Sequence, residues 1–308
     1  MHALDPLSAR ASRGFAALAA VTWGLLVFGA SVRVHGAGLS CPDWPLCFGE
    51  VVPRLDFRIF LEWGHRVLAS VISLGFVALG GLVLAKPALR ARAGVTVGLA
   101  GVALVVQIVL GGLTVLHLLA YWSVTLHLLT GNLFFVLLVV ASLQLRGAAP
   151  AVSPLSRGVR ALGVATAGAV AVQMGLGGLV SSNYAGLACT EWPTCIGGVW
   201  FPALDGSVGL QIFHRLGGYT VAALATALFV LGRGHAAMRT PVSALFALVV
   251  LQVGLGVANV LLAMPVELAI AHSATADLIV LATTLTVYAA LRQPVAARAH
   301  PLVHVEVA

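Results

Sequence analysis

The 308-residue chain has too few charged residues for a water-soluble protein. Hydrophobic residues make up 60% of it and charged residues 9%, whereas soluble domains carry about 25% charged residues. The mean hydropathy is +1.04. This composition excludes a soluble α/β enzyme, a disordered chain and a disulfide-rich secreted module, and it leaves a polytopic membrane protein.

The net charge of +7 reflects membrane topology rather than a nucleic-acid partner. All but one of the 17 cations are arginines, and they lie scattered at the ends of apolar runs. No basic cluster with interleaved aromatic residues is present, which argues against nucleic-acid binding.

Apolar stretches of about 20 residues predict an all-α membrane protein with eight transmembrane helices. The predicted spans are 14–34, 61–85, 94–116, 122–145, 161–181, 209–231, 241–262 and 267–290. The first span follows Arg10 and Arg13, as a secretory signal would, but it is longer than an ordinary signal and no clear small-residue cleavage site follows it. We therefore expect it to be a retained anchor.

The positions of the cations predict cytoplasmic termini, because eight spans leave both ends on one side and positive charge favours the cytoplasm. In the loops of the opposite face we place only Arg33, Arg54 and Arg58. The face shared by the termini carries Arg10, Arg13, Lys86, Arg90, Arg92, Arg146, Arg157, Arg160, Arg233, Arg239, Arg292 and Arg298.

The chain contains two copies of one unit. Cys-Pro-Asp-Trp-Pro-Leu-Cys at 41–47 recurs as Cys-Thr-Glu-Trp-Pro-Thr-Cys at 189–195, 148 residues later. The dipeptide His65-Arg66 recurs as His214-Arg215 after 149 residues. Later in each copy, Gln107, Gly111 and His127 match Gln252, Gly256 and His272 at an offset of 145 residues. An even number of spans in each copy gives both copies the same orientation in the membrane.

We therefore expect two tandem, pseudo-symmetric four-helix bundles. The predicted organisation is an N-terminal tail over 1–13, a first bundle over 14–145, a cytoplasmic linker over 146–160, a second bundle over 161–290 and a C-terminal tail over 291–308. Glycine-rich stretches inside the spans indicate close helix packing, or close approach of the backbone to a flat ligand.

Four histidines are the candidate functional residues, because ionisable groups inside a bilayer are costly and typically functional. His65, His127, His214 and His272 each lie about four to six residues into an even-numbered predicted span, at the outer end. Two imidazoles per bundle at similar depth can bind one metal from opposite faces, as in a six-coordinate haem. Zinc would require a third or fourth ligand, and none is evident. The alternative is that each histidine only hydrogen-bonds a neighbouring helix.

Three charged residues beside these histidines suggest further roles. Arg66 and Arg215 each follow a candidate ligand and are placed to pair with haem propionates, or else to extend to the membrane surface. Glu62 precedes His65 by three residues and hence shares its helix face. Its counterpart in the second copy is the neutral Gln211. This asymmetry suggests that the first half carries out chemistry with Glu62 as an acid/base or charge-stabilising group, unless Glu62 is merely an interfacial residue.

Each copy carries one cysteine pair in an outer loop, where disulfides persist. Duplication favours the local pairings Cys41–Cys47 and Cys189–Cys195 over the other connectivities. A structural staple of the Trp-Pro loop, a redox role with a thiol partner and metal binding are all compatible with the spacing.

Together these motifs resemble the haem A synthases of bacteria and mitochondria over about residues 14–290. The resemblance rests on Gly38-Leu39-Ser40 followed by the 41–47 motif, on Glu62-x-x-His65-Arg66, on His127, on His214-Arg215 and on His272. It implies oxidation of a ring methyl group of haem O to the formyl group of haem A, which serves haem-copper terminal oxidases.

The resemblance also implies where each group binds. His65 and His127 would bind the substrate haem O, and its product haem A, in the N-terminal half beside Glu62. His214 and His272 would ligate a resident haem B in the C-terminal half. The resemblance further implies that a cysteine pair takes part in activity. It also implies a multi-pass location in the bacterial cytoplasmic (inner) membrane, with a haem O synthase and oxidase assembly factors as partners. Whether the chain forms a homo-oligomer, and whether His35 touches the haem edge, stays open, as does the role of His117.

Two other functions remain as alternatives from the residues alone. A bis-His b-type cytochrome or quinol-oxidising electron-transfer subunit needs the four histidines, but not the Glu62 asymmetry or the cysteine loops. A transporter with parallel repeats is less compatible with the pattern, because the polar groups cluster near the outer face rather than at mid-membrane.

Overall fold

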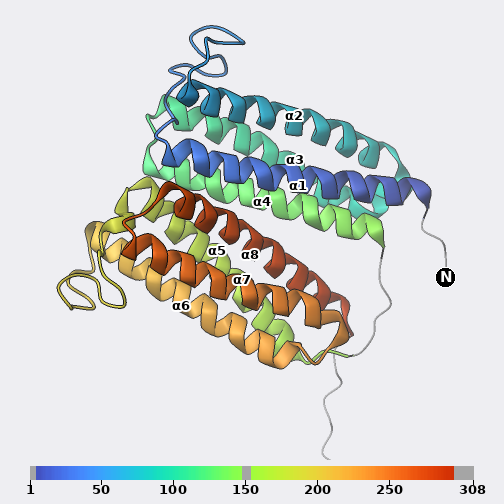
Figure 1. The fold of residues 1–308 in the computed structure, drawn as a ribbon. Coiled ribbons are helices and arrows are strands. Elements are labelled where there is room, and N and C mark those ends of the chain that lie inside the picture. The colour runs from blue at the N-terminus through green and yellow to red at the C-terminus, as the bar shows by residue number, and fades with distance from the viewer. Residues whose placement is uncertain (1–4, 148–153, 295–308) are drawn as a thin grey trace, which may run out of the picture.

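The computed structural model describes residues 5–147 and 154–294, and over these residues it contains eight long α-helices (Figure 1). All eight are long and apolar enough to cross a membrane, which confirms the predicted all-α membrane class. Arg298, most of the C-terminal tail and the centre of the predicted linker lie outside the described residues. The helices are α1 (Pro6–Val34), α2 (Phe57–Ala85), α3 (Pro87–Leu116), α4 (Tyr121–Arg146), α5 (Arg157–Ser182), α6 (Gly206–Gly232), α7 (Ala236–Leu261) and α8 (Val266–Arg292), with a short 3-10 helix η1 (Ala185–Leu187) after α5.

Most helices extend beyond the apolar stretches that predicted them, because local capping rather than hydropathy decides where a helix begins. Asp5 accepts a hydrogen bond from the Leu7 N–H (3.2 Å) ahead of Pro6, so α1 begins well before residue 14. Asp56 accepts from the Ile59 N–H (2.9 Å) and starts α2 in the same way. The structure also corrects the loop assignment of two arginines. Arg58 lies in the first turn of α2, which begins before the predicted span, and Arg33 lies in the last turn of α1, inside the predicted span 14–34.

The helices pack as two neighbouring groups of four (Figure 1). In the first group α1 contacts α2 and α4, and α3 contacts α2 and α4. In the second group α5 contacts α6 and α8, and α7 contacts α6 and α8. Each group has its own buried apolar cluster, with Phe15, Phe135 and Leu138 in the first and Leu228, Met238 and Leu245 in the second. The groups meet where α1 and α4 face α5 and α8.

Polar contacts connect helices inside this apolar environment. Ser12 of α1 and Ser142 of α4 each donate a hydroxyl hydrogen bond to the other's carbonyl oxygen, both at 2.8 Å. Between the two groups, the Trp23 indole N–H donates to the Ala274 carbonyl oxygen at 3.3 Å. Small hydroxyl side chains allow close helix approach in membranes, where there is little hydrophobic force between helices.

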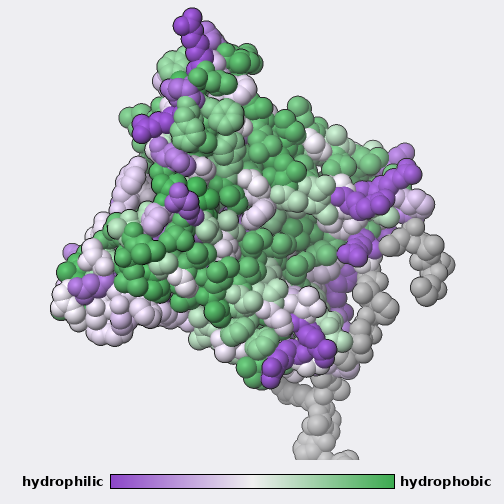
Figure 2. All heavy atoms as spheres, in the orientation of Figure 1, coloured by the Kyte–Doolittle hydropathy of each residue, from purple (hydrophilic) through white to green (hydrophobic). Residues whose placement is uncertain are grey.

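The outer surface of the helices suits a hydrocarbon solvent. Figure 2 shows hydrophobic residues across the middle of the visible face and hydrophilic residues gathered toward the ends. Large apolar side chains such as Val95 (80% exposed) and Leu74 (71% exposed) point outward. The two long loops, 35–56 and 183–205, lie at the same end of the molecule, opposite the N-terminus (Figure 1).

Candidate functional site

The structure places all four predicted histidines near the loop-bearing end, one on each even-numbered helix. His65 and His214 lie eight residues after the first residues of α2 and α6, and His127 and His272 lie six after those of α4 and α8. At about 1.5 Å per residue the depths are about 9–12 Å. They are somewhat deeper than the apolar spans alone suggested, because α2, α4, α6 and α8 each begin one to four residues earlier.

Each histidine packs directly against a glycine of the preceding helix. A Cβ atom added at Gly29 would lie 3.1 Å from His65 Nε2, and one at Gly111 would lie 3.1 Å from His127 Cε1. In the second half, a Cβ at Gly177 or Gly256 would lie 3.2 Å from Cε1 of His214 or His272, respectively. Few real Cβ atoms approach a neighbour so closely, so a larger residue at any of these positions would push the imidazole aside.

The histidines come together in pairs within each half. The ring centroids of His214 and His272 are 6.5 Å apart. His65 and His127 are close enough for their charges to interact. These pairings bring α2 together with α4, and α6 together with α8, across the centre of each group of four.

The polar atoms around the rings are only partly satisfied. Gln107 Nε2 lies 3.1 Å from His127 Nε2, and Gln173 Nε2 lies 3.1 Å from His214 Nδ1. In the described part of the chain, the buried Nδ1 atoms of His127 and His272 have no hydrogen-bond partner. The same is true of the buried side-chain oxygens of four glutamines near the rings, Gln107, Gln173, Gln211 and Gln252. Orphaned polar atoms in a buried site call for a partner such as a ligand.

The His214–His272 pair fits an iron bound from two sides. Two metal–nitrogen bonds of about 2 Å each, plus roughly 1 Å from each nitrogen to its ring centre, give a centroid separation of about 6 Å. The observed 6.5 Å is compatible with this geometry. Within 5–147 and 154–294, no three His, Cys, Asp or Glu side chains form a metal cluster. The donor set therefore suits haem better than zinc.

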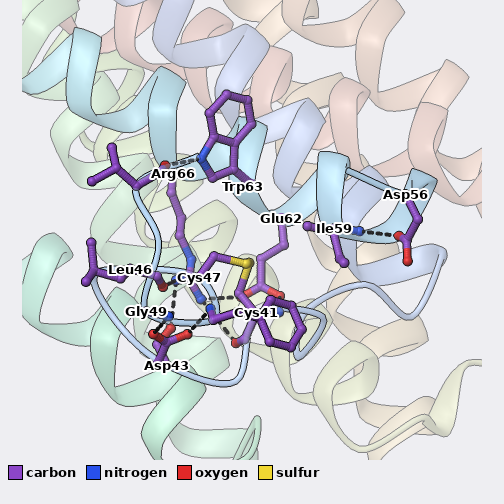
Figure 3. The surroundings of a disulfide bond; sticks show 12 residues. Cys41, Asp43, Leu46, Cys47, Gly49, Asp56, Ile59, Glu62, Trp63 and Arg66 are labelled. Atoms are coloured by element: carbon purple, nitrogen blue, oxygen red, sulfur yellow. Dashed lines mark hydrogen bonds and ion pairs between the residues drawn. A yellow bond between two sulfur atoms is a disulfide. The ribbon is translucent and has the colours of Figure 1, made fainter. Parts of the chain in front are cut away.

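Each half has a disulfide-closed loop at the end that carries the histidines, and Figure 3 shows the loop of the first half. The structure contains both predicted local disulfides, Cys41–Cys47 and Cys189–Cys195, and all four cysteine side chains are buried. In the first loop, N–H groups of Gly49 and Phe48 donate to the Asp43 carboxylate and hold its pKa below the ordinary value.

The second loop repeats this arrangement with a longer acid. Hydrogen bonds from the Gly198 N–H, the Thr194 hydroxyl and the Gly197 N–H lower the pKa of the Glu191 carboxyl. Both disulfides join cysteines six residues apart, so the extra residue that raises the offset between the copies from 148 to 149 lies after Cys195. Asp43 accepts from N–H groups five and six residues later, whereas Glu191 accepts from N–H groups six and seven residues later. Both acids thus have a structural role in folding their loops.

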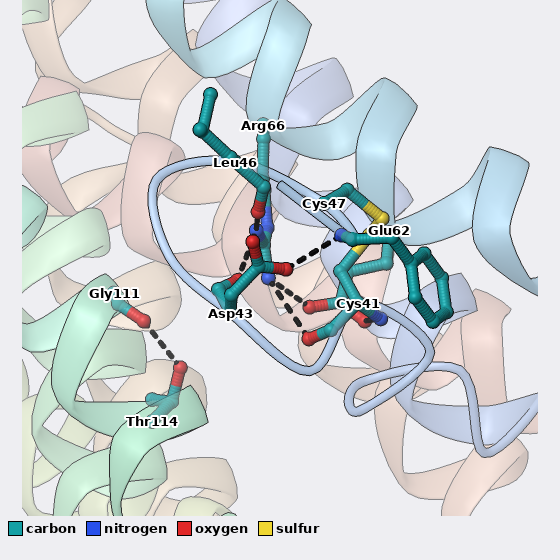
Figure 4. A network of polar contacts seen from close by, with 9 residues as sticks. Cys41, Asp43, Leu46, Cys47, Glu62, Arg66, Gly111 and Thr114 are labelled. Atoms are coloured by element: carbon teal, nitrogen blue, oxygen red, sulfur yellow. Dashed lines mark hydrogen bonds and ion pairs between the residues drawn. A yellow bond between two sulfur atoms is a disulfide. The ribbon is translucent and has the colours of Figure 1, made fainter. Parts of the chain in front are cut away.

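Arg66 and Glu62 fasten the first loop to α2 (Figure 4). The Arg66 guanidinium donates to the carbonyl oxygens of Asp43 (2.8 Å), Leu46 (2.6 Å) and Cys41 (3.4 Å). It also forms an ion pair with Glu62 Oε1 at 2.5 Å, and Glu62 Oε2 accepts from the Cys41 N–H at 2.8 Å. Glu62 is only 5% exposed. A buried carboxylate is thus held at the junction of the loop and the histidine helix.

The second half has the same fastening without the carboxylate. Arg215 donates to the carbonyl oxygens of Thr194 (2.8 Å) and Cys189 (3.1 Å). Gln211 donates to the Gly186 carbonyl oxygen at 3.0 Å and forms no ion pair. Both arginines therefore have loop carbonyls as partners, and their predicted contact with haem propionates stays a prediction.

The matching tryptophans of the two loops, Trp44 and Trp192, pack differently. The Trp44 ring lies against α3, where a Cβ at Gly112 would come within 3.2 Å of it. The Trp192 indole N–H donates to the Tyr219 hydroxyl of α6 at 3.2 Å. Trp44 thus covers the end of the first half beside Gly111, the glycine that contacts His127.

The two remaining outer histidines have partners of their own. His35 Nδ1 lies 2.8 Å from the Ser31 carbonyl oxygen, and its ring contacts Phe57 edge-on. His117 contacts Trp122 in a similar way.

Several residues at or near the site were not assigned to it from the sequence. Gly29 and Gly177 contact ligand candidates, and Gln173 bonds one of them, but single glycines and an isolated glutamine in an apolar span gave only a weak signal. Asp277 of α8 was a clearer signal, because it is an acid inside a membrane span. It is 3% exposed and lies close to Asn132 of α4, between the two groups of helices.

Comparison with known proteins supports the resemblance read from the motifs. Residues 14–284 match the family model COX15-CtaA, described as cytochrome oxidase assembly protein. The chain is 29% identical over 303 aligned residues to a haem A synthase of Shewanella oneidensis, covering 83% of this chain and 89% of the relative. It is 29% identical to a haem A synthase of Methylorubrum extorquens, in an alignment that covers 92% of this chain and 87% of the relative. A third haem A synthase, from Caulobacter vibrioides, is 26% identical, in an alignment that covers 87% of this chain and 92% of the relative.

The family match spans all eight membrane helices, including the four histidines and both cysteine loops. The chain belongs to the COX15-CtaA family of cytochrome oxidase assembly proteins.

Proposed function

We propose that this protein is a haem A synthase, an oxidoreductase that converts the ring methyl group of haem O to the formyl group of haem A. The substrate binds between His65 and His127 in the N-terminal half, and a resident haem B binds between His214 and His272 in the C-terminal half. The observation that carries the proposal is the repeated pair of partly buried histidines, each against a glycine, with the buried carboxylate of Glu62 beside the first pair. Three relatives named haem A synthase support it.

The bound haem B supplies a one-electron redox centre. The protein's contribution there is orientation: His214 and His272 hold the group from opposite sides, while Gly177 and Gly256 keep each imidazole in place. Gln173 helps to hold His214 in place: its Nε2 lies 3.1 Å from the ring Nδ1 and donates to the His214 backbone carbonyl oxygen at 2.9 Å.

In the N-terminal half, Glu62 is the group that handles charge. Oxidising a methyl group releases protons and builds positive character at the carbon, and a nearby carboxylate stabilises such charge or accepts a proton. Arg66 and the Cys41 N–H hold the carboxylate oxygens in place. The disulfide-closed loop and Trp44 cover this end and limit access of water.

The direct test of the function is to identify the haems that the purified chain carries. Expressed together with a haem O synthase and purified in detergent, the chain should contain haem B together with haem A or a hydroxylated form of haem O. Chromatography of the extracted haems with mass detection checks this. Haem B alone would support an electron-transfer cytochrome instead. The absence of any haem would contradict the assignment of the four histidines as haem ligands.

Replacing Glu62 by glutamine should abolish conversion while leaving haem binding intact. Glutamine is what the second half has at this position, so the loop contact can be kept while the charge is lost. We expect at least about a 100-fold drop in haem A formation, measured by the same extraction. Glu50→Gln, which changes an exposed acid in the same loop, is the control. Normal haem A formation by the Glu62→Gln variant would contradict the role given to Glu62.

Replacing His214 or His272 by alanine should remove the resident haem B. The measurement is the low-spin haem signal in absorption and electron paramagnetic resonance spectra of the purified protein. His235→Ala, at the opposite end of the molecule before α7, should leave that signal unchanged. An unaltered spectrum in both ligand variants would place the resident haem elsewhere.

A pair of glycine substitutions on α5 tests the packing against the ligand. Gly177→Ala puts a Cβ 3.2 Å from His214, whereas a Cβ at Gly168 meets no atom within 4 Å. Overpacking costs about 1–3 kcal/mol, which is about a 5- to 150-fold weaker affinity for haem B. Gly168→Ala should bind haem B as the parent protein does. Equal affinities for the two variants in a haem titration would show that the glycine contact does not hold the ligand.

A further inference from the structure

Arg33 is a charged residue near the candidate site that has no role in the arrangement described above. It lies in the last turn of α1 at the loop-bearing end, and its side chain is partly buried. A cation at a helix C-terminus interacts favourably with the helix dipole, and a long side chain there can extend to the membrane surface. Neither effect explains which groups surround Arg33.

Arg33 lies where α1 meets the other half of the molecule. Helix α1 packs against α8, which carries His272, and Arg33 lies in the last turn of α1 at the loop-bearing end. The electrostatic interaction of its charge with Tyr184, after α5, and with His272 agrees with this placement. The packing of α1 against α8, with the Trp23–Ala274 hydrogen bond between them, brings the outer end of α1 beside the C-terminal histidine pair.

The guanidinium has no anion among its neighbours. Over the described ranges 5–147 and 154–294, the Arg33 side chain makes no hydrogen bond or ion pair, although its backbone carbonyl oxygen accepts from the Gly36 N–H. Arg66 and Arg215, by contrast, are held by loop carbonyls. A charged side chain at membrane depth that is only partly accessible to solvent normally pairs with an opposite charge or lines a functional site.

We propose that the Arg33 guanidinium binds a carboxylate of the prosthetic group held between His214 and His272, so that the first half of the chain completes the site of the second half. This inference rests on the proposed function, because it takes haem B as the occupant of that site. A planar fork of N–H donors is well suited to a carboxylate, and a haem carries two of them.

The proposal also predicts a difference between the two sites. With the 148-residue offset of the adjoining loop, the position matching Arg33 in the second copy is Ser181. The first-half site therefore receives no equivalent cation from α5. Since a nearby positive charge favours the iron state with less positive charge, Arg33 should raise the reduction potential of the resident haem relative to a site without it.

The test compares Arg33→Gln and Arg33→Lys with Arg58→Gln, which removes an exposed cation from the same face. Each full-length chain is purified in detergent, and the midpoint potential of the low-spin haem is measured by spectroelectrochemistry at low salt. We expect Arg33→Gln to shift the potential to a more negative value, Arg33→Lys to shift it less, and Arg58→Gln to match the parent. A parent-like potential in Arg33→Gln would overturn the inference.

A second measurement separates a carboxylate contact from a general effect of charge or folding. The haem-depleted parent and Arg33→Lys chains are titrated with haem B and with haem B dimethyl ester, in which both carboxylates are blocked. If Arg33 binds a carboxylate, the substitution should weaken haem B binding severalfold and leave binding of the ester unchanged, as in a double-mutant cycle. An equal effect on both ligands would overturn the inference. If the parent binds neither, the proposed function itself fails.

Discussion

The close contact between each of the four histidines and a glycine of the preceding helix is the constraint on which the loop-bearing end of this protein depends. An imidazole inside a bilayer is costly unless it has a partner, and each ring is limited on the glycine side, because a Cβ on any of the four glycines would lie within 3.2 Å of it. The rings therefore face the interior of each group of four helices. Their positions fix where an iron can bind and how near the loops must come.

The loops are built around that position, and they make the two halves unequal. In both halves a disulfide and an acid fold the loop, and an arginine next to a histidine ties it down through carbonyl oxygens. Only the first half adds a buried carboxylate, Glu62, paired with Arg66. The two copies of the scaffold therefore differ in charge beside the first histidine of each pair, with Glu62 in one and Gln211 in the other.

The contact surface between the two groups of helices adds a second asymmetry. The Trp23 indole N–H donates to the backbone of α8 two residues after His272, and Asn132 on α4 lies close to the buried Asp277 on the same helix. Helix α8 therefore carries a ligand candidate and is held by polar contacts from the first half. Arg33 lies on this surface, which is why a residue of the first copy faces the site of the second.

The sequence by itself determined the class of protein, the eight spans, the repeat and the four histidines. Hydropathy and the duplicated motifs report on the solvent and on residue identity, and both are local properties of the chain. It was less accurate for helix ends, since caps such as Asp5 and Asp56 extend helices past their apolar stretches. Only the tertiary structure decided which groups meet: the glycines that confine the histidines, the loop carbonyls that hold Arg66 and Arg215, and the neighbours of Arg33. These contacts join a helix to another helix or to a loop, and those of Arg33 connect residues more than 100 positions apart. They depend on how the helices rotate against each other, which no pattern along a single helix encodes.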